Sequence, residues 1–286
     1  MDVSVIIVNY NTKKLTIECI QSLLATERDV NFEVILIDNA STDGTIQEVN
    51  KLFPHVITIE NRENLGFSKA NNQGIVRAAG RYVLLLNSDT VVEPHTLSTM
   101  VNYMDTHSNV GASGCKLVLP NGQLDEACKR GFPTPLGSFY YALGFSRRHP
   151  SNPKYNQYKL THLNPDDVHE VDCLVGAFMF VRREVIESIG GLDEDFFMYG
   201  EDIDWCYRIK QSGWGIVYYP RTTVIHYKGA SSRKKPLKII YEFHRAMVLF
   251  HRKHYQKRYP FFINGLVYAG IGMLFFVSLM KNLLKS

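Results

Sequence analysis

The sequence predicts an α/β fold with a Rossmann-like, mostly parallel central sheet flanked by helices. Two observations support this prediction. The first half of the chain contains short apolar runs, such as VSVIIV at 3–8 and YVLLL at 82–86, which are typical of strands buried on both faces of a parallel sheet. Segments with helical apolar spacing separate these runs, and alternating strands and helices are the pattern of βαβ units.

The expected elements follow one another closely up to residue 110. Strands are expected at 3–8, 32–37, 56–59 and 82–86, and helices at 12–24, 43–53 and 68–79. Gly80 follows the third helix and is expected to end it, because glycine readily adopts the left-handed conformation of a helix C-cap. Pro and Gly residues then punctuate 120–165, a stretch that we expect to form long loops facing the substrate.

The C-terminal part of the chain differs from the rest in charge. From Ser231 onwards the sequence has eleven Lys or Arg residues and one acid, Glu242, whereas the preceding residues carry a net charge of −6. A uniformly basic chain would suggest a nucleic-acid partner, but a basic tail on an acidic body indicates a membrane surface instead, and no nucleic acid is expected. Apolar residues at helical spacing within 237–250 predict a basic amphipathic helix.

Residues 261–280 form an uncharged apolar segment of twenty residues. At about 1.5 Å per residue, a helix of that length spans roughly 30 Å, the thickness of a bilayer core. The length favours a single membrane span, but Asn264, Ser278 and three glycines leave as alternatives a hairpin or helix in the membrane interface, or one packed on the protein. More basic residues precede the segment than follow it, so the protein is expected at the cytoplasmic face of the membrane.

Polar residues follow the expected strands at their carboxyl ends. The segments are NYN at 9–11, DNASTDG at 38–44 and NSD at 87–89. Each alone is compatible with a turn or a helix cap, which Asn, Asp, Ser and Gly favour for local reasons. Because open α/β sheets bind ligands beyond the carboxyl ends of their strands, three such segments at one edge predict a binding site.

Two aspartates at this edge suggest the chemistry of the site. Asp89 ends a very apolar strand, and a carboxylate there suits Mg²⁺ or Mn²⁺, which bind hard oxygen ligands. Such a cation would bridge a diphosphate and offset its charge as it leaves. Asp38 could accept a hydrogen bond from a base or a ribose.

Further acids open an expected helix after the aromatic run at 196–199. Acids in a first helical turn are favoured by the helix dipole. Three carboxylates within four residues exceed what a cap requires, and Glu201 and Asp202 therefore suggest a general base. His226 follows a strand-like segment at 222–225, and a lone histidine there is more typical of a structural residue than of a ligand.

Seven segments of the chain occur in an order that points to one enzyme family. They are SVIIVNYN, IDNASTDGT, RENLGFSKANNQG, LLNSDT, GAFMFVRREV, GGLDEDFFMYGEDIDWCYR and HYKGASS. The series, over residues 3–233, resembles family 2 glycosyltransferases, and most closely the rhamnosyltransferase-like enzymes of bacterial cell-surface polysaccharide synthesis. The resemblance implies a GT-A fold, a nucleotide-sugar donor and inversion at the anomeric carbon.

The resemblance also implies roles for individual residues. The nucleotide site would contain Asn9, Asn11, Asp38, Asn64, Asn71 and Asn87. Asp89 would be the metal ligand of a D-x-D-like motif in which Asn87 replaces the first acid, and His226 would match a histidine that reaches the metal in some members. Asp202 would be the general base of an E-D motif, with Glu201 beside it.

These residues lie in three expected regions. Residues 1–233 would form the catalytic domain, with 1–110 as its nucleotide-binding half and 111–233 as its acceptor-binding half. Residues 234–286 would form a helical, membrane-associated extension.

The sequence therefore predicts an inverting, metal-dependent hexosyltransferase. It would move a sugar from a nucleoside-diphosphate donor, dTDP-rhamnose or a UDP-sugar, to a hydroxyl of a glycan or lipid-linked acceptor in cell-surface polysaccharide synthesis. A sugar-phosphate nucleotidyltransferase is one alternative, but that class usually has a glycine-rich, basic phosphate loop where this chain has NYNT at 9–12. A non-catalytic membrane adaptor is the other, and the presence of Asp89, Asp202 and His226 argues against it.

Overall fold

The computed structural model describes residues 1–26, 29–228 and 237–284. Its first half alternates strands and helices. The elements are β1 (Val3–Asn9), α1 (Lys13–Thr26), β2 (Phe32–Asp38), α2 (Thr45–Leu52), β3 (Ile57–Glu60), α3 (Phe67–Arg77) and β4 (Tyr82–Asn87). All four strands and all three helices expected before residue 90 are therefore confirmed.

The second half is less regular. It contains β5 (Thr90–Val92), α4 (Thr96–Thr106), β6 (Val110–Val118), a 3₁₀ turn (Glu126–Cys128), α5 (Pro135–Ala142), α6 (Phe145–Arg148), β7 (His169–Glu170), β8 (Phe178–Arg182), α7 (Arg183–Ile189), α8 (Glu201–Gln211) and β9 (Gly215–His226). A C-terminal hairpin follows, with α9 (Leu237–Phe250), a π-helical turn (His251–Tyr255) and α10 (Phe261–Leu283).

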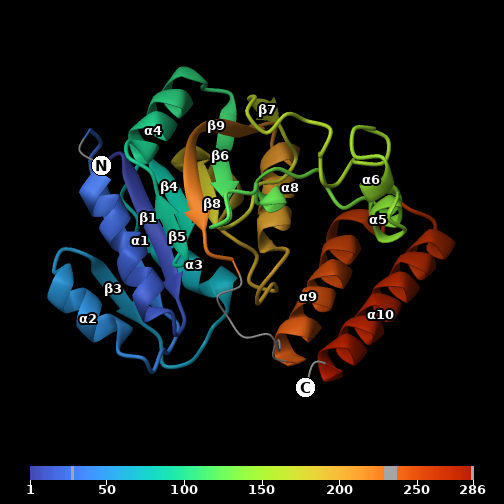
Figure 1. Cartoon of the computed structure of the whole chain (residues 1–286), viewed down its shortest axis with the longest axis horizontal. Coiled ribbons are helices and arrows are strands. Elements are labelled where there is room, and N and C mark those ends of the chain that lie inside the picture. Colours follow the sequence, from blue (N-terminus) through green and yellow to red (C-terminus); the bar gives the residue numbers. More distant parts are fainter. Residues whose placement is uncertain (27–28, 229–236, 285–286) are drawn as a thin grey trace.

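One twisted sheet joins the two halves, with helices on both of its faces (Figure 1). The strand order is β3-β2-β1-β4-β8-β6-β9-β5, and β7 pairs with β9. The pairs among β3, β2, β1 and β4 are parallel, whereas β8 lies antiparallel between β4 and β6. The predicted α/β fold with a largely parallel sheet is confirmed, and the antiparallel strands belong to the second half.

The register of the parallel strands sets the position of the site. Asn9 pairs with Asp38 across β1 and β2, and Val8 pairs with Asn87 across β1 and β4. The side chains of β1 are almost fully buried, since the strand lies between two others and is covered by helices on both faces. The three polar segments at 9–11, 38–44 and 87–89 therefore end at one edge of the sheet, as the sequence predicts.

Two expectations about local structure are wrong. Gly80 does not cap α3, which ends at Arg77, and its backbone is not left-handed. A Cβ on Gly80 would lie 2.5 Å from the backbone nitrogen of Ser4, so glycine is required there by close approach to β1. The stretch 120–165 also contains α5 and α6 rather than loops alone, because Pro135 opens α5 and Thr134 Oγ1 accepts from Gly137 N at 3.1 Å.

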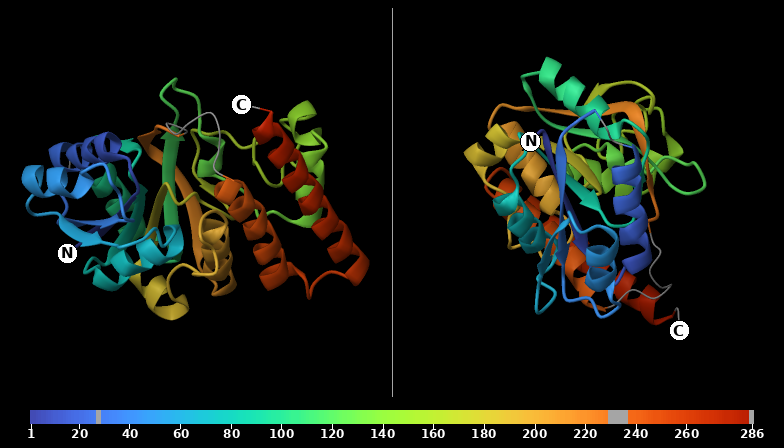
Figure 2. Two further views of the ribbon diagram at one scale, coloured as in Figure 1. Left: turned by 90° about the horizontal axis from the view of Figure 1, so that it is seen from below. Right: turned by 90° about the vertical axis from the view of Figure 1, so that its left-hand side faces the viewer.

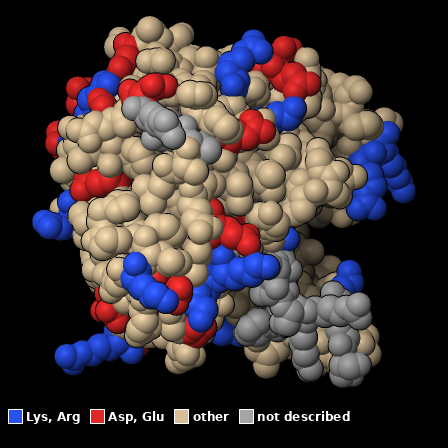
Figure 3. All heavy atoms as spheres, turned by 60° about the vertical axis from the view of Figure 1, so that its left-hand side comes forward, with Lys and Arg blue, Asp and Glu red and all other residues tan. Residues whose placement is uncertain are grey.

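The α5–α6 segment and the α9–α10 hairpin lie at the same end of the molecule, away from α2 and β3, in both Figure 1 and Figure 2. Among the described residues, α10 is the one helix that is long and apolar enough to cross a membrane, and 6% of its most apolar window is buried. On the face drawn in Figure 3, acidic and basic side chains are interspersed over the α/β body, residues 1–228. The predicted boundary between residues 233 and 234 lies outside the described residues.

Candidate active site

The carboxyl ends of β1 and β2 are tied together by a buried hydrogen-bond network. Asn9 is fully buried, and its Nδ2 donates to Asp38 Oδ1 at 2.6 Å and to Ser41 Oγ at 2.9 Å. Asp38 Oδ2 accepts from Ser41 N at 2.8 Å. Both carboxylate oxygens of Asp38 thus accept hydrogen bonds from the chain itself. Asp38 therefore fixes the conformation of the loop that a nucleotide would contact.

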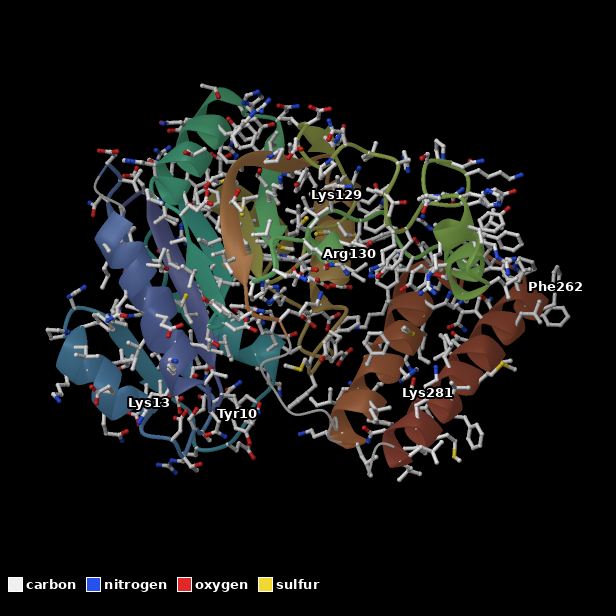
Figure 4. All side chains as sticks on the ribbon, in the orientation of Figure 1. Tyr10, Lys13, Lys129, Arg130, Phe262 and Lys281 are labelled. Atoms are coloured by element: carbon white, nitrogen blue, oxygen red, sulfur yellow. The ribbon has the colours of Figure 1, made fainter. Side chains whose placement is uncertain are left out.

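The turn after β1 extends this network to the surface. Asn11 has a left-handed backbone with φ of 54°, and its Oδ1 accepts from Thr42 N at 2.8 Å. Tyr10 is half exposed beside it, near the first residue of α1, and Figure 4 shows Tyr10 and Lys13 at this open edge. The exposed Tyr10 ring is a suitable platform for a base, whereas amides at the start of α1 are already bonded, Thr12 N to Asn9 and Lys13 N to Asp43.

The segment before α3 is attached to the same edge by side-chain amides. Asn39 Nδ2 donates to Gly66 O at 3.0 Å, and Asn64 Oδ1 accepts from Gly66 N at 2.9 Å. Asn71 is buried, and its Nδ2 donates to Phe67 O at 2.9 Å. The structure therefore places Asn64 and Asn71 beside the end of β2, where their observed bonds shape the loop.

The end of β4 meets a histidine from the long strand β9. Thr90 pairs with His226 across β5 and β9, and Asp89 Oδ1 lies 3.4 Å from His226 Nε2. The other ring nitrogen, Nδ1, lies 2.9 Å from Asp125 Oδ2, whose second oxygen accepts from Lys228 Nζ at 2.9 Å. His226 and Asp125 are buried, so burial works against the charged imidazole, but the hydrogen bonds to Asp125 and Asp89 outweigh it and raise the pKa of His226 to about 9.

This arrangement fits a divalent cation in its donor set. An aspartate oxygen and a histidine nitrogen face each other, and the second histidine nitrogen is oriented by a carboxylate, which is a common second partner of metal-binding histidines. Within the described ranges, no three His, Cys, Asp or Glu side chains converge as a metal site. Asp89 and His226 would thus supply two ligands once a cation displaces the proton of His226 Nε2, and a bound anion or water would have to supply the others.

Two adjacent acids, Glu201 and Asp202, open α8. Gly200, at φ 80°, turns the chain into the helix, and Asp202 Oδ2 accepts from Arg130 Nη2 at 2.6 Å. Arg130 Nη2 also donates to Leu174 O at 2.7 Å, and both members of the ion pair are about nine-tenths buried. A buried ion pair with further hydrogen bonds is held in one geometry, so Asp202 has a fixed orientation.

Glu201 differs from its neighbour. It is buried, and its Oε2 has no hydrogen-bond partner among the residues that the structure describes. Burial, reinforced by the charge of Asp202, raises the pKa of Glu201 above its ordinary value. The two adjacent acids are therefore in different states, with Asp202 paired as a carboxylate and Glu201 favouring its neutral form.

A short loop connects the β4 edge with the start of α8. Asn87 N donates to Ala177 O at 3.0 Å, and a Cβ on the adjacent Gly176 would lie 4.0 Å from the Cβ of Asp202. Asp89, one of the two candidate metal ligands, lies two residues after Asn87, so the 176–177 loop lies between the β4 edge and the first turn of α8. The structure thus brings together the predicted residues of both halves.

Asp125 and Arg130, which orient His226 and Asp202, are not among the residues predicted from the sequence. Both lie in the segment DEACKRG, 125–131, within the stretch that was expected to be loops. The available signal was the group of charged residues in this short segment. Figure 4 shows Lys129 and Arg130 near the centre of the molecule, between the sheet and the α5–α6 segment.

Comparisons with known protein families and sequences agree on one family. The model described as "Glycosyltransferase like family 2" matches residues 1–240. The chain is 31% identical over 245 residues to N-acetylglucosaminyl-diphospho-decaprenol L-rhamnosyltransferase of Mycobacterium tuberculosis, covering 79% of this chain and 76% of that protein. It is 27% identical over 175 residues to rhamnosyltransferase WbbL of Escherichia coli, covering 59% of this chain and 63% of WbbL.

Solved structures share the fold at lower sequence identity. Residues 1–349 of Staphylococcus aureus TarS superpose with a TM-score of 0.55 at 21% identity, over 87% of this chain and 64% of that one. The mannosyltransferase PcManGT from Pyrobaculum calidifontis, in complex with GDP-Man and Mn²⁺, superposes with a TM-score of 0.57 at 20% identity, over 88% and 63%. The chain thus spans just under two thirds of both solved chains, and the likeness concerns the fold.

The buried Glu201 predicts a pH-dependent gain in stability for the Glu201→Gln variant. Because the folded-state pKa lies above the unfolded value of about 4.3, the wild type loses stability as pH rises from that value through the folded-state pKa, whereas the neutral amide does not. The thermal midpoint of the variant should exceed that of the wild type by roughly 3 °C or more near pH 8.5, and the gap should close near pH 5. Circular dichroism melts at both pH values measure this difference.

The control is Glu187→Gln, at an exposed position on α7. Its midpoint should follow that of the wild type at both pH values. A gap for Glu201→Gln that is the same at both pH values would contradict the assignment of a neutral Glu201.

Proposed function

Since the chain belongs to glycosyltransferase family 2, and is therefore a nucleotide-sugar glycosyltransferase, we propose that it is an inverting rhamnosyltransferase of cell-surface glycan synthesis. The sequence similarity to two proteins named as rhamnosyltransferases supports the sugar, and dTDP-rhamnose is then the donor to test first, with UDP-sugars second. The name of the mycobacterial relative contains a diphospho-decaprenol acceptor, which supports a lipid-linked acceptor here. Family membership disfavours both the nucleotidyltransferase and the adaptor.

We assign the donor to the edge formed by β1, β2 and β4. The nucleotide would bind over the Asn9–Asp38–Ser41 network, with Asn11, Asn64 and Asn71 around it and Asn87 below the diphosphate. Asp89 and His226 would hold a divalent cation, which supplies positive charge against the diphosphate. The fold shared with a Mn²⁺-bound mannosyltransferase supports this choice of metal. Residues 1–110 would thus serve the donor, and 111–233 the acceptor.

The observation that carries the proposal is the fixed Asp202 carboxylate at the start of α8, joined to the β4 edge by the 176–177 loop. Asp202 would take the proton of the acceptor hydroxyl as that oxygen attacks the anomeric carbon from the side opposite the diphosphate. One base suffices, because a diphosphate leaves without being protonated once its charge is offset. Glu201 would stay neutral beside Asp202, and Arg130 would hold the base in place.

The apolar and basic C-terminal hairpin supports a membrane-associated enzyme. The exposed apolar helix α10 is preceded by basic residues, and we place the enzyme at the cytoplasmic face of the membrane. A lipid-linked acceptor would be presented at that surface.

The Asp202→Asn variant should lose transfer but keep donor binding. Removing the base should lower the rate of sugar transfer by about 10²-fold or more, while the affinity for the nucleotide stays within about threefold of the wild type. Product formation from dTDP-rhamnose and nucleotide titration by calorimetry measure the two effects. The neighbouring Glu201→Gln variant is the matched control and should retain transfer, and full activity in Asp202→Asn would refute the assignment of the base.

The Arg130→Gln variant should lower the rate of transfer. Without the guanidinium, Asp202 loses the ion pair that holds its carboxylate in one orientation, so kcat at neutral pH should fall about tenfold or more. Arg130→Lys keeps a charge and should recover part of the loss. Lys129→Gln removes a charge from the same loop, where Nζ donates to Leu160 O and Leu163 O, and should leave kcat close to that of the wild type. An unchanged kcat in Arg130→Gln would contradict the role of the ion pair.

Nucleotide binding should depend on metal through Asp89 and His226. Adding Mn²⁺ should strengthen binding of dTDP to the wild type by about tenfold or more, and Asp89→Asn or His226→Asn should remove that gain. Asp125→Asn, which loses the orienting partner of His226, should reduce it in part. Calorimetry with and without Mn²⁺ measures these affinities, and Asp166→Asn, an exposed acid paired with Lys116, is the control. The same affinity with and without Mn²⁺ in the wild type would exclude the metal site.

A further inference from the structure

Helix α10 has two unlike faces. Asn264, Tyr268 and Ser278 carry the polar side chains of one stripe of the helix, and the partly buried Phe275 lies on the same stripe. The opposite face is apolar and exposed. Its exposed members include Phe262, Leu266, Met273, Phe276 and Met280. Three polar side chains on one stripe are poorly suited to lipid, so the stripe favours contact with protein.

That partner is α9 with the turn after it, and the contacts join residues 244–251 to residues 264–278. Near the turn, Asn264 Oδ1 lies 2.7 Å from His251 Nε2, and the rings of Tyr268 and His251 are 5.4 Å apart. Near the other end, Ser278 Oγ lies 3.4 Å from His244 Nε2, whose ring is 5.4 Å from that of Phe275. The two helices therefore form an antiparallel hairpin that is bonded at both ends (Figure 1).

Helix α9 and the turn after it are in turn fixed to the α/β body beside the candidate base. His254 Nε2 lies 2.7 Å from Asp204 Oδ1 on α8. Lys253 Nζ lies within 2.6 Å of a carboxylate oxygen of both Asp193 and Asp195. Tyr207 of α8 packs against the aromatic group at 250–255. The body, α9 and α10 are thus three successive layers, and Figure 2 shows the hairpin at one end of the molecule.

This layering is incompatible with α10 as a membrane span. If α10 crossed the bilayer with its contacts intact, α9 and the charged groups Lys238, Arg245 and Arg252 would have to enter the hydrocarbon, where charges are costly. If α10 separated from α9 instead, Asn264 Oδ1 would lose its bond to His251 Nε2 and Ser278 Oγ its contact with His244 Nε2, in a medium that offers few other partners. Length and composition favour a span, but the packing of the polar stripe favours a helix parallel to the surface.

We propose that α10 lies in the plane of the membrane interface, with its apolar face against the acyl chains and its polar stripe on α9. Charge identifies the partner as an anionic lipid surface. The sequence has no Asp or Glu after Glu242, and exposed basic residues flank α10 at both ends. They are Arg252, Lys257 and Arg258 before it and Lys281 in its last turn; Figure 4 shows Phe262 and Lys281 toward opposite ends of the helix. A basic, amphipathic helix with exposed aromatics is suited to the interface of such a bilayer.

The orientation deepens the proposed function, on which this step rests. A single helix, α9, separates the interfacial helix from α8, whose first turn carries Asp202. Packed helices lie about 8–10 Å apart, so the base would sit within roughly two helix layers of the lipid headgroups. The sugar of a lipid-linked acceptor can reach that position while its lipid stays in the bilayer. This accounts for a catalytic centre next to a membrane-bound hairpin.

Site-directed labelling tests the orientation. All five native cysteines are buried, so a cysteine introduced at exposed Lys257 or Lys281 reports the two ends of α10 separately. In the full chain expressed in a bacterial inner membrane, a membrane-impermeant maleimide should label both Lys257→Cys and Lys281→Cys in inverted vesicles, and neither in intact spheroplasts. Labelling of Lys281→Cys from the periplasmic side, with Lys257→Cys labelled from the cytosolic side, would show that α10 spans the membrane and would overturn the proposal.

Vesicle binding tests the partner. Replacing both Phe262 and Leu266 with Glu should weaken binding to vesicles of phosphatidylglycerol and phosphatidylethanolamine by about tenfold or more, because two large apolar side chains no longer enter the bilayer. Val76→Glu on α3, at an apolar residue that is 87% exposed, is the matched control and should bind like the wild type. Equal binding by the double variant, or a wild type that forms dimers in solution through this face without binding vesicles, would overturn the proposal.

Calorimetry with dTDP separates this test from that of the proposed function. The double variant should bind the nucleotide as the wild type does, because the substituted side chains lie on the outer face of α10. A wild type that binds vesicles but transfers no sugar would refute the proposed function and leave the interfacial helix intact.

Discussion

The in-register parallel pairing of β1 with β2 and β4 is the constraint on which the rest of the structure depends. It buries almost all of β1 and carries Asn9 next to Asp38, and Val8 next to Asn87. A shift by one residue would exchange the side chains between the two buried faces and would separate Asn9 from Asp38, so the register is strongly fixed. Because the register is fixed, three polar loops are forced to one edge, and the buried Asn9–Asp38–Ser41 bonds then hold those loops for a ligand.

The second half of the chain completes the site through buried charges. Arg130 and Asp125 each pair with a residue far away in sequence, on α8 and on β9, and each pair is largely desolvated. Buried ion pairs contribute little net stability, but removing one partner leaves a costly unpaired charge, so the pairs specify geometry. They fix a carboxylate near the 176–177 loop and an imidazole beside Asp89, and the imidazole comes from β9, a strand of the same sheet as the nucleotide edge.

The C-terminal hairpin follows the same principle at the surface. The polar side chains of α10 bond to α9 and the turn after it, and that turn bonds to α8. The apolar surface proposed to contact lipid is therefore held in a fixed position relative to the candidate active site. A flexible tether would bring the enzyme to the membrane, but it would leave the distance between base and bilayer undefined. A packed hairpin sets that distance through side-chain contacts.

The sequence by itself determined the first half of the fold, the edge at which the site lies and the family, because these depend on apolar periodicity and on short motifs that are local in the chain. It also proposed Asp89, Asp202 and His226 as site residues, through the family that its motifs resemble. Only the tertiary structure decided that Arg130 pairs with Asp202, that Asp125 orients His226 and that Glu201 Oε2 is buried with no partner among the described residues, because these depend on contacts between residues about 70 to 100 positions apart or on burial. It also decided why residue 80 is glycine and which face of α10 packs on α9. Close approach of two backbones and the packing of one helix face on another leave no periodic pattern in the sequence. An apolar helix of twenty residues also has the same length whether it spans a membrane or lies in the interface, so length does not distinguish the two.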